Sequence, residues 1–289
     1  MGLQSTPEQV ERVVKACRRM LAKNPKSAAA HHDLAVALMQ QLKFAEAAKH
    51  LQKAIEIAPK QVLSHYLLGV AFAEQNQPDR AIGAWEKLLE YDKHHAEAHY
   101  FLGKVHAMQG KTEESLQYLE RAMTLEPKNK NFASTLAEVY VLKGELVKGK
   151  MTWQKIVAED PREVKALANL AAVSLDLAEN EEALYFGEQV LSLGQEDARV
   201  RFNMGLASLR LNNYLQAAVH LRRAHELAPQ DVDILRSLGE AYERAEKKDE
   251  AALAREMAGA LDAQSPHPHF NTTGPNRGFW SKLLHRLRR

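Results

Sequence analysis

Large hydrophobic side chains recur along the chain with a period of 34 residues. Frames of this length start at residues 28, 62, 96, 130, 164, 198 and 232, and they align without any insertion. Position 7 of the seven frames is occupied by Leu34, Leu68, Leu102, Leu136, Leu170, Met204 and Leu238. Further large apolar residues fall near frame positions 24 and 27. The pattern predicts one helix–turn–helix unit per frame.

Small residues occupy two other positions of the frame. Position 8 reads Ala35, Gly69, Gly103, Ala137, Ala171, Gly205 and Gly239, and position 20 reads Ala47, Ala81, Ser115, Gly149, Ala183, Ala217 and Ala251. Small side chains at both positions let the two antiparallel helices of a frame approach closely. Five prolines fall at one position, where they end the second helix: Pro25, Pro59, Pro127, Pro161 and Pro229. One hairpin cannot bury its apolar face alone, so we expect the frames to stack into a solenoid.

This pattern resembles the tetratricopeptide repeat (TPR) family. The resemblance covers about residues 28–265 in seven frames and implies an all-α, right-handed superhelical solenoid of helix-turn-helix repeats. Frames 2 and 5 depart from it by lacking the proline, since Lys93 and Gln195 stand there. Residues 6–27 fit an N-terminal half-repeat capping helix that opens with a capping box, Thr6 to Gln9. Cys17 falls on its apolar face, where we expect a buried side chain and not a reactive thiol.

The resemblance implies a concave groove lined by frame positions 2, 5, 6, 9, 12 and 13. In the first three frames this surface is rich in aromatic residues and methionine: His32, Val36, Met39, Leu63, Tyr66, Val70, Tyr100, Lys104 and Met108. Such a surface suits an apolar peptide or one face of a partner helix. Packing between neighbouring repeats is the alternative role for each of these residues.

Frames 5 to 7 place polar and basic residues in the same groove. They are Lys165, Asn169, Arg199, Phe202, Asn203, Leu206, Leu209, Arg210 and Arg236. Asparagine at position 6 of adjacent frames can hydrogen-bond an extended peptide, and arginine can hold a carboxylate. We therefore expect a mixed peptide site; the alternative is a solvated surface. No three successive frames carry the lysine, asparagine and arginine pattern with which some TPR co-chaperones grip a terminal carboxylate, so that function is not inferred.

Composition narrows the choice of function. The 289 residues include only 14 glycines, 10 prolines and one cysteine, which favours helices and excludes an internal disulfide. The net charge of +2 divides into +5 for residues 266–289 and −3 for the rest, so no nucleic-acid partner is expected. No secretory signal or membrane-spanning run is visible. A cytoplasmic location is predicted, with the membrane periphery as the alternative within it.

Two apparent chemical motifs have simpler interpretations. Four histidines cluster in one part of the chain: His94, His95, His99 and His106. However, histidine recurs at frame position 4, which indicates packing and not a metal site. Residues Gly144 to Lys150 read G-x-x-x-x-G-K, but Met151 stands where a phosphate-binding loop needs serine or threonine. No metal, no cofactor and no catalytic constellation is expected, and the chain is interpreted as non-enzymatic.

Residues 266–278 are rich in proline and glycine and predict a flexible linker. Residues 279–289 then form a basic amphipathic segment. Its apolar arc holds Phe279, Trp280, Leu283, Leu284 and Leu287, and its basic side holds Lys282, Arg286, Arg288 and Arg289. Eleven residues are too few for a stable isolated helix. The segment is expected to fold against an anionic membrane, against this protein itself, or against another protein.

We therefore hypothesise a protein-binding scaffold that holds a peptide or partner helix in its groove, with the tail as a candidate tether to a membrane surface. Two alternatives remain: a regulatory or targeting subunit of a separate enzyme, and a self-assembling structural protein. The sequence leaves the oligomeric state open.

Overall fold

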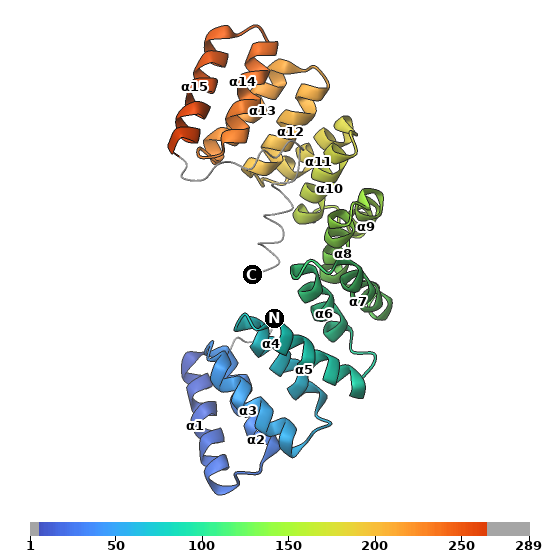
Figure 1. The fold of residues 1–289 in the computed structure, drawn as a ribbon, viewed down its shortest axis with the longest axis vertical. Coiled ribbons are helices and arrows are strands. Elements are labelled where there is room, and N and C mark those ends of the chain that lie inside the picture. The colour runs from blue at the N-terminus through green and yellow to red at the C-terminus, as the bar shows by residue number, and fades with distance from the viewer. Residues whose placement is uncertain (1–5, 265–289) are drawn as a thin grey trace. The chain divides into compact units, whose positions relative to one another are not determined.

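The computed structural model describes residues 6–264, and every element in that range is a helix. The chain divides into two compact units, residues 1–128 (unit 1) and residues 129–289 (unit 2). Within each unit, helices that follow one another in the sequence lie side by side (Figure 1). The chain is an all-α helical repeat solenoid, as the hydrophobic period predicts.

The described part of unit 1 contains seven helices: α1 (Pro7–Lys23), α2 (Ala28–Gln40), α3 (Phe44–Ile57), α4 (Val62–Glu74), α5 (Pro78–Tyr91), α6 (Ala96–Met108) and α7 (Thr112–Leu125). The described part of unit 2 contains eight: α8 (Lys130–Leu142), α9 (Leu146–Glu159), α10 (Val164–Asp176), α11 (Asn180–Ser192), α12 (Ala198–Arg210), α13 (Tyr214–Leu227), α14 (Val232–Arg244) and α15 (Lys248–Gln264). The even-numbered helices begin at the seven frame starts, and we call them first helices. The odd-numbered helices from α3 to α15 are the second helices.

Local sequence explains where these helices begin. Thr6 and Gln9 form the expected capping box, since the Gln9 amide donates to Thr6 Oγ1 at 3.3 Å and the Thr6 amide donates to Gln9 Oε1 at 2.7 Å. Short polar side chains cap several first helices in the same way, for example Ser27 and Asp197. These caps satisfy backbone N–H groups that have no partner inside the helix.

The turn between the two helices of a frame has one conformation throughout. Frame position 15 has a positive φ in all seven frames: Leu42, Asn76, Gly110, Gly144, Ala178, Asn212 and Glu246. This left-handed backbone suits glycine and asparagine and is unfavourable for a side chain such as that of Leu42, at φ 58°. Gly144, at φ 88°, is therefore explained by the turn and not by phosphate binding.

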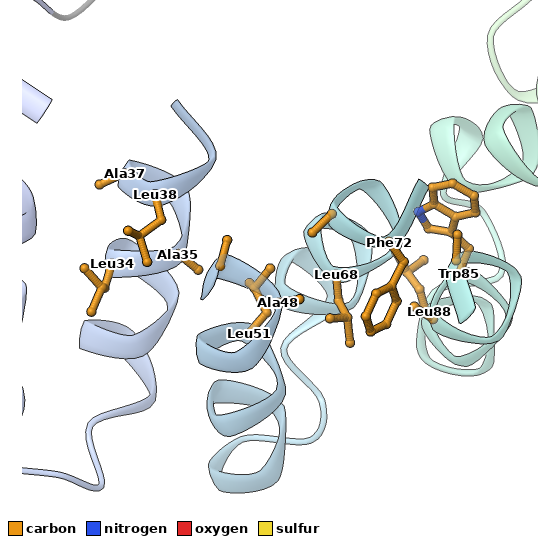
Figure 2. Packing of buried hydrophobic residues seen from close by; sticks show 14 of the residues in the cluster. Leu34, Ala35, Ala37, Leu38, Ala48, Leu51, Leu68, Phe72, Trp85 and Leu88 are labelled. Atoms are coloured by element: carbon orange, nitrogen blue, oxygen red, sulfur yellow. The ribbon is translucent and has the colours of Figure 1, made fainter. Parts of the chain in front are cut away.

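Close helix packing forms the core of unit 1 (Figure 2). The fully buried Trp85 of α5 lies against Gly69 of α4, where an added Cβ atom would come within 2.2 Å of the Trp85 Nε1 atom. Trp85 Nε1 also donates to the Tyr66 carbonyl at 3.2 Å, and its ring stacks on Phe101 with centroids 5.4 Å apart. The small residue at position 8 thus makes room for the largest side chain of the next helix.

The histidines at frame position 4 stabilise the loop before their own helix. His31, His65 and His99 each place Nε2 within 2.8–3.2 Å of a backbone carbonyl six residues earlier. Because a carbonyl only accepts, Nε2 carries the proton in all three rings. In His31 the other nitrogen then accepts from His50, with 2.9 Å between the Nδ1 atoms. Burial, with His31 close by, lowers the pKa of His50.

The loop between α11 and α12 lacks the proline that ends other frames. Glu196 holds this loop instead, because its carboxylate accepts from Arg201 at 2.7 Å and from Arg223 at 2.8 Å. The two guanidinium groups keep the pKa of Glu196 at about 2. Gly194, at φ 72°, supplies the sharp turn that comes just before it.

Candidate functional site

The candidate binding surface is the face of the first helices made by frame positions 2, 5, 6, 9, 12 and 13. We call this the first-helix face and describe it for each unit separately. In unit 1 most of the predicted residues are half-buried: Val36, Met39, Tyr66, Val70, Tyr100, Lys104 and Met108. They come from α2, α4 and α6 and form a surface that is mainly apolar. Leu63 is exposed.

Aromatic contacts hold the rings of this face in place. Tyr66 stacks on His95 with ring centroids 5.3 Å apart, and the centroid of its ring lies 6.0 Å from that of Phe101. The rings of Tyr100 and Phe101 pack edge to face, with their centroids 5.2 Å apart. Burial raises the pKa of Tyr66, and the nearby Glu97 adds to this. Rings fixed in this way can contact an apolar ligand with little loss of side-chain entropy.

His32 differs from the other predicted residues of unit 1. Its ring is buried, and its Nδ1 lies 2.9 Å from Ser64 Oγ on α4. This bond links two neighbouring repeats, so His32 serves inter-repeat packing, which was the alternative role for each residue of this surface.

In unit 2 the first-helix face brings together amide and charged groups from α8, α10 and α12. Asn169 and Asn203, at position 6 of adjacent frames, are both buried. The Asn169 Nδ2 group has no hydrogen-bond acceptor among the described residues. Lys165 is exposed and lies 3.2 Å from the buried Glu138 carboxylate of α8. Half-buried apolar residues lie on the same face, namely Phe202, Leu206 and Leu209.

The predicted arginines of unit 2 take part in contacts within the protein. Arg210 donates to the Leu175 carbonyl at the end of α10. Arg236 pairs with Asp233 at 3.3 Å and with Asp262 of α15 at 2.7 Å. Arg199 is half-buried and also has a contact. An anionic ligand would therefore have to compete with these partners for the guanidinium groups.

Three polar residues of this face escaped sequence reasoning: Thr135, Glu138 and Asp176. Thr135 and Glu138 are buried at positions 6 and 9 of the fourth frame, which lies between the apolar and the polar parts of the predicted groove. Asp176 stands at position 13 of the fifth frame, and burial raises its pKa to about 6 although Arg210 opposes the shift. Reading the same frame positions in every repeat would have found all three.

The clustered histidines have structural partners, and so does the lysine of the apparent phosphate-binding loop. His99 binds the Lys93 carbonyl, and His94 lies 3.0 Å from Arg121. Between residues 6 and 264, no three histidine, cysteine or acidic side chains are placed to share a metal ion. Lys150 is buried and pairs with Glu179 at 2.5 Å and with Glu182 at 2.6 Å. Cys17 is buried, and burial raises the pKa of its thiol.

Family models match most of the chain. Tetratricopeptide repeat models match residues 66–130, 202–266 and 106–173, and a TPR repeat model matches residues 37–76. The chain belongs to the tetratricopeptide repeat family. No curated protein matches this TPR chain. In the described part, none of its helices combines the length and the apolar character needed to cross a lipid bilayer.

Solved TPR structures share the fold at low sequence identity. MamA from Desulfovibrio magneticus is 20% identical, with a TM-score of 0.57, over 60% of this chain and 97% of its own. PilF from Pseudomonas aeruginosa is 21% identical, with a TM-score of 0.60, over 72% of this chain and 94% of its own. YrrB, a TPR protein with an unusual peptide-binding site, is 18% identical, with a TM-score of 0.57, over 65% of this chain and 96% of its own.

The tail residues of the sequence prediction lie outside the described residues. These are Phe279, Trp280, Leu283, Leu284, Arg286, Leu287 and Arg288. The same holds for the linker 266–278.

Proposed function

We propose that this TPR chain is a non-catalytic scaffold that binds a protein partner, as a peptide or a helix, on its first-helix faces. Asn169 carries the proposal. Its Nδ2 group is a buried donor without an acceptor among the described residues, and leaving such a donor unpaired costs about 1–3 kcal/mol. Because Nδ2 is closed to solvent in this conformation, a rotation of the amide toward the face would bring it to a carbonyl of a bound peptide and remove this cost. Asn203 in the next repeat is spaced to hold the same strand.

Apolar residues beside the two asparagines support this interpretation. Phe202 and Leu206 are half-buried on the same face of α12 and can take an apolar side chain of the ligand. The Lys165 and Glu138 pair offers one cation and one anion to polar groups of the peptide. YrrB, whose repeats share this fold, is a TPR protein with an unusual peptide-binding site, which shows that such repeats can hold a peptide.

The unit 1 face suits a different ligand surface. Met39, Val70 and Met108 are flexible or branched apolar side chains, and the rings of Tyr66 and Tyr100 lie among them. Methionine adapts to irregular apolar partners, so this face fits the apolar side of a helix.

Selection of displayed peptides on the full chain tests the proposal. Binding should weaken about thirtyfold in the double variant Asn169→Ala and Asn203→Ala, since each of the two lost hydrogen bonds is worth about 1 kcal/mol. The matched control is Gln154→Ala, which removes an exposed amide from the second helix α9. Selected peptides that bind the double variant and wild type equally would contradict the role of the asparagines.

Tethering of residues 279–289 to an anionic membrane stays a prediction, as does the cytoplasmic location. Cosedimentation of the full chain with phosphatidylserine vesicles tests the tether, which should weaken in high salt because surface charge is screened.

A further inference from the structure

Unit 2 carries a stripe of exposed apolar side chains on its second helices. Frame position 22 holds Met151 on α9, Tyr185 on α11, Val219 on α13 and Leu253 on α15, with exposed fractions of 53%, 57%, 46% and 58%. Val147, Leu215 and Met257 stand one helical turn away on the same helices and are also exposed. We call these seven residues the outer stripe.

Unit 1 provides an internal comparison for this stripe. The same frame position there holds Lys49, Gly83 and Gln117. The repeat fold therefore does not require an apolar residue at position 22, since three repeats do without one. Four large apolar residues at one exposed position of successive repeats indicate a surface that becomes covered.

We infer that residues 279–289 of this chain dock on the outer stripe over α13 and α15. The segment has an apolar arc that includes Phe279, Trp280 and Leu283, and it is too short to be stable as an isolated helix. Packing this arc on the stripe buries two apolar surfaces that water otherwise contacts. The inference is independent of the function proposed for the first-helix faces.

The chain can reach the stripe easily. Leu253 and Met257 lie on α15, the helix that ends at Gln264, so Leu253 is about 16 Å from that end at 1.5 Å per residue. The fourteen residues 265–278 span up to about 50 Å when extended. An 11-residue helix would be about 16 Å long, which limits the docking to neighbouring second helices such as α13 and α15.

Charge favours this surface over the first-helix face of unit 2. The segment carries four of the five positive charges of residues 266–289. Acidic residues flank the stripe on α11 and α15: Glu181, Glu182, Glu188, Asp249, Glu250 and Glu256. Of these, Glu182 already pairs with Lys150 and Glu250 with Lys247. On α13 between them, Arg222 opposes the segment, whereas Arg223 is already paired with Glu196 and Glu226. On the first-helix face, Lys165, Arg199, Arg210 and Arg236 are offset by Glu138, Asp176 and Asp233, so this face attracts a basic segment less strongly than the stripe does.

Quenching of tryptophan fluorescence by acrylamide tests the docking in the full chain. The chain has three tryptophans, and Trp85 and Trp153 are fully buried, so a soluble quencher reports mainly on Trp280. Docking predicts that Trp280 is protected in wild type. In the variant Val219→Lys and Leu253→Lys, the quenchable part of the emission should rise to the share that comes from Trp280, because Trp85 and Trp153 stay buried. The matched control places lysine at the same frame position in unit 1, Gly83→Lys and Gln117→Lys, and should leave Trp280 protected.

Other results would overturn the inference, provided that circular dichroism shows both variants folded. Trp280 that is freely quenched in wild type and protected only by phosphatidylserine vesicles would assign the segment to a membrane. Exposure caused by Leu206→Lys but not by the stripe variant would assign it to the first-helix face. Protection that is lost on dilution would assign it to a second copy of the chain.

Discussion

Replacing Gly69 by alanine should destabilise unit 1, although alanine is the better helix former. The new Cβ atom would lie 2.2, 2.4 and 2.6 Å from the Nε1, Cε2 and Cδ1 atoms of Trp85. Favourable carbon contacts need about 3.5–4.0 Å, so the indole ring would have to move by about 1 Å or more. That shift would disturb both the hydrogen bond to the Tyr66 carbonyl and the stacking on Phe101.

The size of the effect follows from three contributions. Overpacking costs about 1–3 kcal/mol and a weakened hydrogen bond about 1 kcal/mol, whereas the helix gains about 1 kcal/mol from losing a glycine. We expect a net loss of about 2 kcal/mol in the free energy of unfolding. Gly83→Ala in the partner helix α5 is the matched control, because nothing lies within 4 Å of its added Cβ atom. That variant should gain about 0.5–1 kcal/mol.

Urea unfolding followed by circular dichroism measures both variants against wild type. Trp85→Leu removes the indole ring, so Gly69→Ala should cost less in that background than in wild type. Equal midpoints for Gly69→Ala and Gly83→Ala would refute the packing argument. So would an unchanged cost of Gly69→Ala in the Trp85→Leu background.

Three further predictions concern the turns and the charged groups, and urea midpoints measure each. Leu42→Gly should stabilise the chain by about 1 kcal/mol, because Leu42 is exposed and has a left-handed backbone conformation. The control Gln117→Gly places glycine inside a helix and should destabilise the chain. Asp176 has a folded-state pKa of about 6, above its ordinary 3.8, so stability should fall as pH rises from about 4 to 6. Asp176→Asn should remove this fall and gain about 1–2 kcal/mol at pH 7, allowing for partial exposure; an unchanged pH profile would refute the assignment. Glu196→Gln should lower the urea midpoint at neutral pH. The pKa of Glu196 is depressed to about 2, so the difference in midpoint between variant and wild type should persist above pH 4.5 and vanish as the pH falls toward 2.

The 34-residue period was enough to predict the fold class and the family. It also predicts contacts that recur, such as the small residues at position 8. It does not show contacts made by single residues. The bond between His32 and Ser64 depends on side-chain geometry between two repeats, and the pairing of Glu196 with two arginines replaces a missing proline. The candidate binding residues remain predictions, because only a bound partner would show which of them make contact.

Each helix contacts mainly the helices next to it in the sequence. During synthesis, α4 and α5 can pack around Trp85 once residues up to about the end of α6 have left the ribosome, because Phe101 and Tyr66 complete that core. No strand or helix from the distant end of the chain is needed to close it. Folding can therefore follow translation repeat by repeat. A chain released early would keep the folded structure of the repeats already made.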